Sequence, residues 1–406
     1  MNNIFDVIII GAGPSGSSCA ISLRDTGLRV ALIDKSVFPR EKTCGDGLTL
    51  DVVKQLSIMS EELAEAFRKL ISKNPVYGIK VYSAENKSVS IPILQKNERR
   101  CMYTVKRIDF DNLLIQFIKN KTNISVYEDC CLENIELKPD SIVLKTSKGN
   151  FESTIVIGAD GANSIVAKTL RPLKINDDDK AITLRNYYKG VSLENEDLFI
   201  EFYFNKKILP GGMWVFPIGN DIVNVGLGMP LSTLKKKKIN LAKVLDEEIK
   251  NGVLKDTFKN AHPIDKLQGH IIPLGKNKRP VSGERFLLTG DAAGFANALS
   301  GEGIGNALRS GRVAALHITK CFKEHNFSKA FNHKYDIEIY RRMGREFNNY
   351  RLLQYLFRFP SVVNYLIRKV APHFINVFGN PEFVTKAQGK RFFTFILIKY
   401  IVFKRR

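Results

Sequence analysis

Short, mainly apolar runs alternate along the chain with longer segments of mixed polarity. Residues 6–10 (DVIII) and 29–33 (RVALI) are such runs, and they predict parallel strands that are buried on both faces. Between them a glycine-rich turn at residues 11–16 leads into apolar positions with helical spacing, and Gly27 closes that helix. The three segments together predict a βαβ unit at the start of the chain.

Later segments repeat both patterns. Residues 76–105 and 180–230 alternate polar and apolar positions as antiparallel strands do, while residues 303–320 have the spacing of a helix. Apolar runs at 155–157 and 285–289 predict further buried strands. The remainder of the chain, from about residue 320, has mostly helical spacing.

These patterns predict an α/β protein with a discontinuous Rossmann-like dinucleotide-binding domain. A β-sheet-rich domain interrupts it, and a helical region follows it. The predicted limits are 1–75, 101–175 and 270–320 for the first domain, 76–100 and 176–269 for the second, and 321–406 for the C-terminal region. A chain of 406 residues exceeds the usual size of one core, which agrees with more than one lobe.

The composition places the chain among ordinary soluble proteins. Its hydrophobic share of 44% and charged share of 25% are typical of globular domains. The N-terminal residues lack a basic segment before the apolar run, so they predict a buried strand and not a signal peptide. The six cysteines show neither a CxxC pair nor metal-binding spacing, which predicts a reducing, cytoplasmic setting, no disulfide framework and no metal site.

The net charge of +21 is concentrated towards the C-terminus. Residues 323–406 hold seventeen Lys and Arg against five Asp and Glu, a balance of +12. No nucleic-acid-binding motif accompanies this charge, and the basic residues alternate with apolar ones, which favours an anionic membrane surface at the inner face of the membrane. Residues 392–403 (FFTFILIKYIVF) are too few to span a bilayer. They form either an interfacial segment or a buried terminal helix, and the basic residues could alternatively serve solubility alone.

The turn at residues 11–16 (GAGPSG) has the spacing of a dinucleotide-binding loop. Gly11 permits the tight turn, Gly13 lets the backbone approach a pyrophosphate, and Gly16 allows close packing of helix on strand. The start of the following helix directs N–H groups at the phosphates. Asp34, at the end of the second strand, is placed to accept hydrogen bonds from a ribose.

Two further glycine motifs follow predicted buried strands. One spans residues 158–164 and contains Asp160 and Gly161, and the other spans residues 289–294 and contains Asp291. Each alone could be an ordinary turn, because Asp-Gly is a common turn pair. In this order and together with the first motif, they favour one extended cofactor cradle.

With these motifs, residues 1–320 resemble the FAD-dependent geranylgeranyl reductase group within the hydroxylase-like flavoproteins. The resemblance implies FAD as the cofactor, with Asp34 at the adenosine ribose and Asp291 at the ribityl chain. It also implies a cofactor contact for Arg107 in VKRIDFDNLL, for which an ordinary surface arginine is the less favoured alternative. The remaining predicted cofactor contacts are Gly11, Gly13, Pro14, Ser15, Gly16, Lys35, Cys44, Gly45, Asp160, Gly161, Gly301, Gly303 and Ile304.

Two features point to the reductase branch of that group, and SGEGIGNALRSG at 300–311 completes the flavin-binding pattern with a helix aimed at the ring. Residues 39–48 (PREKTCGDGL) look like the cysteine loop of the reductases near the flavin. LPGGMWVFP at 209–217 is similar to their substrate-lobe signature, although glycine and methionine stand where that signature usually has a tyrosine. The predicted apolar wall for the substrate is Trp214, Phe216 and Pro217; the alternative for these residues is plain sheet core.

The resemblance implies an FAD-dependent oxidoreductase that reduces C=C bonds of an isoprenoid or lipid-linked substrate. The electron donor would be NAD(P)H or a ferredoxin-like protein. Cys44 is the candidate catalytic residue, for proton delivery, shielding or packing. Two alternatives stay open: an FAD-dependent monooxygenase of an apolar substrate, and a non-catalytic membrane-associated flavoprotein.

Overall fold

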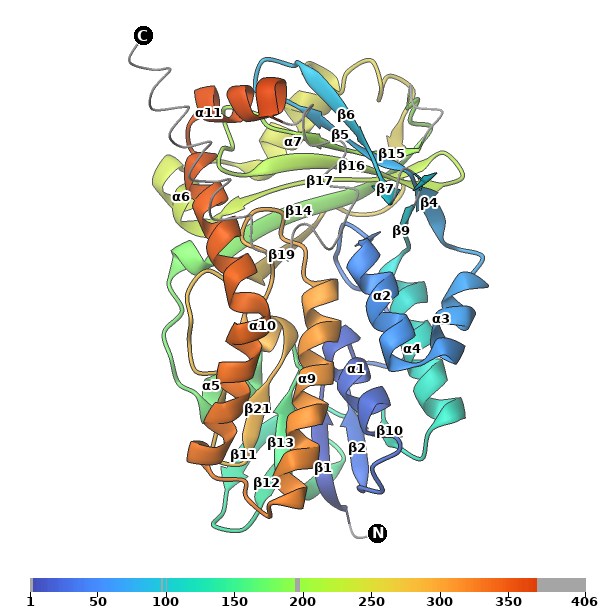
Figure 1. The fold of residues 1–406 in the computed structure, drawn as a ribbon. Helices are drawn as coiled ribbons and strands as arrows, with labels where there is room; N and C mark the ends of the chain where they lie inside the picture. Colours follow the sequence, from blue (N-terminus) through green and yellow to red (C-terminus); the bar gives the residue numbers. More distant parts are fainter. Residues whose placement is uncertain (1–2, 96–97, 100, 194–197, 371–406) are drawn as a thin grey trace.

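The computed structural model describes residues 3–95, 98–99, 101–193 and 198–370. Figure 1 shows two large sheets, one at each end of the molecule, with long helices running beside the lower one. The predicted segment 392–403 lies outside the described residues. Among the described helices, none is at once long enough and apolar enough to cross a membrane.

The first sheet follows the predicted βαβ start of the chain. Its strands are ordered β10 (Ser125–Tyr127), β2 (Val30–Ile33), β1 (Ile4–Ile10), β13 (Gly149–Gly158), β12 (Ile142–Thr146) and β11 (Leu132–Leu137). β21 (Phe286–Leu288) also pairs in parallel with β13, and β20 (Ser282–Gly283) pairs with β21. The middle strands β1 and β2 are parallel and apolar because helices and loops cover both of their faces.

Helices surround this sheet. Those from the first half of the chain are α1 (Pro14–Leu23), α2 (Leu50–Met59), α3 (Glu61–Arg68), α4 (Arg107–Lys121) and α5 (Ile165–Leu170). Those from the second half are α8 (Gly290–Ala293), α9 (Ile304–Lys323) and α10 (Lys329–Leu356). The last helix, α11 (Pro360–Tyr365), and the π-helical turn at Leu366–Val370 pack instead against the other sheet, at the opposite end of the molecule (Figure 1). Side-chain caps begin several of them; Ser328, for example, accepts a hydrogen bond from the backbone of Phe331 at the start of α10.

The second sheet is built largely from antiparallel strands of the middle of the chain. Its order is β18 (His262–Pro263), β14 (Lys180–Lys189), β17 (Ile222–Pro230), β16 (Gly212–Gly219), β15 (Phe199–Tyr203), β5 (Gly78–Tyr82) and β6 (Ser88–Pro92), with β19 (Gln268–Pro273) also on β14. One face packs on α6 (Leu231–Lys237) and α7 (Leu241–Lys250) through a separate apolar core. The opposite face meets the first lobe.

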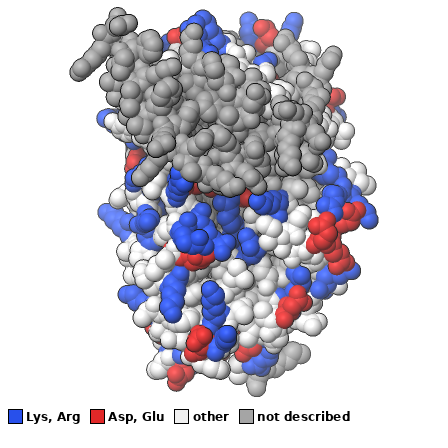
Figure 2. Space-filling model, viewed as in Figure 1, with Lys and Arg blue, Asp and Glu red and all other residues white. Residues whose placement is uncertain are grey.

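Small elements join the two sheets. They are the three-stranded sheet β3 (Gly47–Leu48), β9 (Met102–Thr104) and β4 (Asn74–Val76), the pair β7 (Leu94–Gln95) and β8 (Glu98–Arg99), and the 3-10 turn Asp177–Asp179. The predicted fold class, a Rossmann-like domain interrupted by a β-rich domain and followed by helices, is confirmed. The predicted residue limits of the domains stay a prediction. In Figure 2, basic side chains gather over the face that carries α9 and α10.

The closest helix contact of the first lobe lies between α1 and α9. Gly311 of α9 sits against the backbone of α1, where an added Cβ would lie 2.1 Å from the carbonyl oxygen of Ser15. Beside it, the Ser18 hydroxyl donates a hydrogen bond to the carbonyl of Leu308 at 2.6 Å. Because α1 starts at the glycine turn of residues 11–16, this contact fixes where that turn lies.

The close approach of α1 and α9 predicts that alanine substitution at two helical glycines will change the stability of the protein differently. Gly311→Ala should lower the free energy of unfolding by about 1–3 kcal/mol, because the new methyl group meets backbone that cannot move aside. Gly344→Ala, in α10, is the matched control. Its Cβ would have 3.5 Å to the nearest atom, so alanine should be neutral or stabilise by up to about 1 kcal/mol. Urea unfolding of both variants tests this, and a Gly311→Ala protein as stable as the parent would contradict it.

Candidate active site

The three glycine motifs meet at the carboxyl edge of the first sheet. The backbone N–H of Ala159 donates to the carbonyl of Ile10 at 2.8 Å, and the N–H of Thr289 donates to the carbonyl of Gly158 at 2.9 Å. β1, β13 and β21 therefore end side by side. This edge is where open α/β sheets bind nucleotides.

The first turn has the geometry that a phosphate-binding loop requires. Gly11 has a φ of +100°, and Gly16 lies so close to it that a Cβ would be 1.8 Å from the Gly11 carbonyl oxygen. Above Gly13 the nearest atom to an added Cβ is 3.8 Å away, on Arg40, so the backbone there is open to a ligand. The carboxylate of Asp34, partly exposed, accepts hydrogen bonds from the N–H groups of Ala12 at 2.7 Å and Ser36 at 2.8 Å.

The second motif serves its own helix. Asp160 accepts a hydrogen bond from the Ser164 hydroxyl at 2.5 Å and from the N–H of Ile165 at 2.7 Å, at the start of α5. Gly161 has a φ of +77°, which favours glycine in this turn. The structure thus gives Asp160 a capping role, and its predicted contact with the cofactor stays a prediction.

The third motif lies against the start of α9. Asp291 Oδ1 would be 3.5 Å from a Cβ on Gly303, the N-cap of that helix, and Gly301 has a φ of +71°. Burial raises the pKa of Asp291, while the charges of Lys42 and Arg107 act to lower it. α9 begins at the buried Ile304, so the positive end of its helix dipole lies beside Asp291.

Arg107 is buried and forms an ion pair with Asp111 within the protein. Its Nε and Nη2 lie 2.8 and 2.7 Å from the two carboxylate oxygens of Asp111, and Arg40 Nη1 lies 3.0 Å from the same group. The Arg107 guanidinium is also within hydrogen-bonding reach of the Cys44 thiol. Burial raises the pKa of that thiol and Arg107 opposes the rise, so Cys44 is a protonated thiol at neutral pH.

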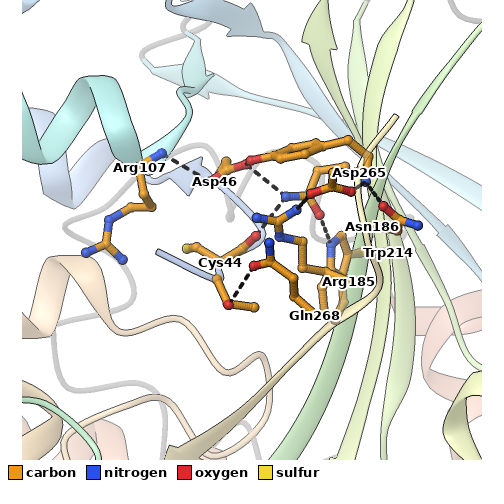
Figure 3. A network of polar contacts seen from close by, with 11 residues as sticks. Cys44, Asp46, Arg107, Arg185, Asn186, Trp214, Asp265 and Gln268 are labelled. Atoms are coloured by element: carbon orange, nitrogen blue, oxygen red, sulfur yellow. Dashed lines mark hydrogen bonds and ion pairs between the residues drawn. The ribbon is translucent and has the colours of Figure 1, made fainter. Parts of the chain in front are cut away.

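The loop that carries Cys44 and Asp46 (Figure 3) is bonded to the second sheet through the side chain of Asn224. The Tyr187 hydroxyl and the Asn224 amide both donate to Asp46 Oδ2, at 2.5 and 2.8 Å. The same amide donates to the Cys44 carbonyl at 2.7 Å, and its oxygen accepts from the Trp214 indole at 2.9 Å. Asp46 has no exposed surface, and burial raises its pKa to about 6.

Two aromatic side chains lie directly over this loop. An added Cβ on Gly45 would be 3.4 Å from both Trp214 and Phe216, and one on Gly47 would be 3.3 Å from Phe216. Pro217 accepts hydrogen bonds through its carbonyl from Thr104 and from Asn74. Trp214 and Phe216 thus form an apolar surface facing the Cys44 loop, while Pro217 joins its strand to the small three-stranded sheet.

Two more contacts close the junction between the lobes. Lys42 Nζ lies 2.8 Å from His270 Nε2, and the Thr43 hydroxyl donates to Gln268 at 2.9 Å. Burial and the neighbouring Lys42 and Arg107 lower the pKa of His270 to about 4, so the neutral ring accepts a hydrogen bond from the lysine. Lys35, in contrast, is exposed.

Sequence reasoning missed the partners that hold this site together. They are Arg40, Lys42, Asp46, Asp111, Arg185, Tyr187, Asn224, Asp265, Gln268 and His270. Asp111 was detectable, because it follows Arg107 by one helical turn. The only sequence signal for Asn224 and Arg185 is that each is a polar residue within the strand-like segment 180–230. Among the described residues, no group of three or more His, Cys, Asp or Glu side chains is placed to hold a metal ion.

Comparison with known proteins agrees with this geometry. Residues 5–327 match the family model described as FAD binding domain. The chain is 30% identical over 355 residues to digeranylgeranylglycerophospholipid reductase 2 of Methanosphaera stadtmanae, covering 85% of each chain.

Two solved structures have the same fold. A geranylgeranyl bacteriochlorophyll reductase-like protein of Thermoplasma acidophilum matches with a TM-score of 0.80 and 23% identity, covering 91% of both chains. A flavin-dependent brominase matches with a TM-score of 0.75 and 21% identity, covering 99% of both. At such identities these two likenesses concern the fold alone.

The residues present fit FAD. The open backbone at Gly13 suits its pyrophosphate, Asp34 suits its ribose, and the start of α9 beside Asp291 suits its flavin end. The family model and the reductase relative together identify the chemistry of the cradle. The chain belongs to the FAD-binding-domain family, as a geranylgeranyl reductase-like, FAD-dependent oxidoreductase.

Proposed function

We propose that this protein reduces carbon–carbon double bonds in the isoprenoid chain of a lipid-like substrate. The observation that carries the proposal is that Trp214 and Phe216 lie over the loop of Cys44, a thiol that burial keeps protonated. Lys42 and Arg107, beside that thiol, also act on the pKa of Asp291 in the predicted cofactor site. The digeranylgeranylglycerophospholipid reductase that is 30% identical supports the same substrate class.

Alkene reduction needs a hydride, a proton and a dry surface. Bound FAD supplies the hydride chemistry. Cys44 holds a proton that it can give to the substrate, and the Arg107 guanidinium beside it stabilises the thiolate that remains. Trp214 and Phe216 hold an apolar chain and exclude water from it.

Two further partners belong to this proposal. The electron donor is NAD(P)H or a ferredoxin-like protein, and an anionic membrane surface meets the basic C-terminal region. A peripheral position at the inner face of a membrane would bring the enzyme to a lipid-borne substrate. The brominase match supports no halogenase function, because it concerns the fold alone.

Anaerobic turnover tests the proposed reaction. The FAD-loaded protein, reduced with dithionite, should add two hydrogen atoms per double bond to a digeranylgeranylglyceryl phospholipid or a prenylated quinone, as followed by mass spectrometry. The control is the same incubation with the lipid in air. Oxygenated product together with substrate-stimulated oxygen uptake would replace this proposal by a monooxygenase.

Cys44 has a matched control in the exposed Cys131. Cys44→Ala should lower kcat about 10²–10⁴-fold without loss of FAD, because a positioned proton donor contributes a factor of that size. Cys131→Ala should leave kcat unchanged. Turnover at the parental rate by a fully FAD-loaded Cys44→Ala protein would remove the thiol from the mechanism.

Asp46 makes the stability of the protein depend on pH. Its pKa of about 6 in the folded state, against 3.8 for an ordinary aspartate, means that folding favours the protonated carboxyl. The parent should therefore lose up to roughly 3 kcal/mol relative to Asp46→Asn as pH rises from about 4 to about 7.

Urea unfolding across that pH range measures the difference. Asp25→Asn is the control, since Asp25 is 84% exposed and its replacement should leave the parental pH curve unshifted. If the free energy of unfolding depends on pH in the same way for the parent and for Asp46→Asn, burial does not raise the pKa of the Asp46 carboxyl.

A further inference from the structure

Lys42, on the loop that carries Cys44, is a half-buried cation without a carboxylate partner. Among the described residues, no Asp or Glu oxygen lies within 4.0 Å of its ammonium group. The two arginines beside it, Arg40 and Arg107, both contact the carboxylate of Asp111. A charge that is partly removed from water without a counter-charge is unfavourable, unless a ligand supplies the opposite charge.

A neutral histidine holds this ammonium group in place. Lys42 Nζ lies 2.8 Å from His270 Nε2, and burial together with the charges of Lys42 and Arg107 lowers the pKa of His270 to about 4. The ring is therefore neutral at neutral pH and accepts a hydrogen bond from the lysine without cancelling its charge. The adjacent Thr43 hydroxyl donates to Gln268 of the same strand, β19, at 2.9 Å. The two bonds fix the loop, and among the described residues the ammonium has no second hydrogen bond.

The charge of Lys42 acts at the flavin end of the predicted cofactor site. Burial raises the pKa of Asp291, and the charges of Lys42 and Arg107 oppose that rise. Burial lowers the pKa of Lys42 itself, while Asp291 and Cys44 act to raise it. Asp291 lies beside Gly303, the N-cap of α9. The ammonium group and the positive end of the helix dipole therefore bring positive potential to the same region.

The cofactor gains negative charge when it is reduced. FAD that takes up two electrons and one proton retains one negative charge on its ring system. A cation whose position is fixed before that charge develops stabilises it more than mobile water does, because no reorganisation is needed. Reduced FAD would thus supply the counter-charge that Lys42 lacks within the described chain.

We propose that Lys42 is the cationic partner of the reduced flavin and that His270 is its positioning residue. Lys42 stays protonated and transfers no proton; its charge favours the reduced cofactor over the oxidised one and so raises the flavin midpoint potential. His270 acts only by fixing the ammonium group. The inference deepens the proposed function, on which it rests only in requiring that FAD be reduced, and it is independent of the identity of the lipid.

The flavin midpoint potential tests the assignment without any lipid. The FAD-loaded protein is reduced anaerobically with dithionite beside a reference dye, and the potential is obtained from the flavin absorbance. Lys42→Met should lower the potential by at least about 30 mV, which corresponds to a tenfold loss of preference for the reduced cofactor in a two-electron couple. Lys42→Arg keeps the charge and should retain most of the parental potential.

Two substitutions of His270 test its positioning role. His270→Leu removes the acceptor and should lower the potential, whereas His270→Gln offers the lysine an amide oxygen and should restore it. In a Lys42→Met background, His270→Leu should cause no further change, because the histidine acts through the lysine. If Lys42→Met does not fold, the comparison of His270→Leu with His270→Gln carries the test.

Lys54→Met is the control for the loss of one positive charge. Lys54 lies in α2 of the same lobe, is exposed and has no carboxylate partner among the described residues. Its replacement should leave the potential unchanged. A second control is the Kd of geranylgeranyl diphosphate for the oxidised, FAD-loaded protein, which should be the same in the parent and in Lys42→Met.

Three results would overturn the assignment. One is a parental midpoint potential in FAD-loaded Lys42→Met. Another is a shift of equal size in Lys54→Met. The last is diphosphate binding that depends on Lys42 while the potential does not, which would make a phosphate group the counter-charge. Failure of lipid reduction alone would contradict the proposed function and leave the measured potentials valid.

Discussion

One buried amide holds the two lobes in register. Asn224 has no exposed surface, and its polar atoms bond to Trp214 in the second sheet and to Cys44 and Asp46 in the loop of the first lobe. Because a buried polar group left without a partner is costly, none of these segments can slide without breaking several bonds at once. Asn224 thus links the thiol loop directly to the aromatic surface, and the bonds of Lys42, Thr43 and Asp46 to the same sheet reinforce the link.

The charges around this amide are arranged so that few remain unbalanced. Arg107 is paired with Asp111, and Arg185 with Asp265. Where a carboxyl group lacks a close cation, burial raises its pKa, as it does for Asp46 and for Glu302, whose pKa rises to about 7. Burial therefore shifts the pKa of these acidic groups towards the neutral range, which favours their protonated form more than water would.

The sequence predicted those parts of the protein that depend on short-range constraints. Gly16 meets the Gly11 carbonyl within one turn, and Gly11 has the positive φ that the predicted tight turn requires. The network around Asp46 could not be predicted, since its bonds to Tyr187 and Asn224 join residues 141 and 178 positions apart. Asp160 shows a second limit of prediction from motifs. Its carboxylate caps α5 in the structure, and the same sequence motif is compatible with that local role as well as with a cofactor contact.

The cradle and the junction carry different information about function. Reductases and a brominase share this fold, so the glycine turns, Asp34 and Asp291 specify the cofactor and leave the reaction open. The reaction depends on what the second sheet presents to the flavin end of the cradle. In this chain it presents Trp214 and Phe216 directly over the Cys44 loop, and Asn224 bonds that loop to the sheet. Under the proposed function, this aromatic surface selects the isoprenoid chain of the substrate.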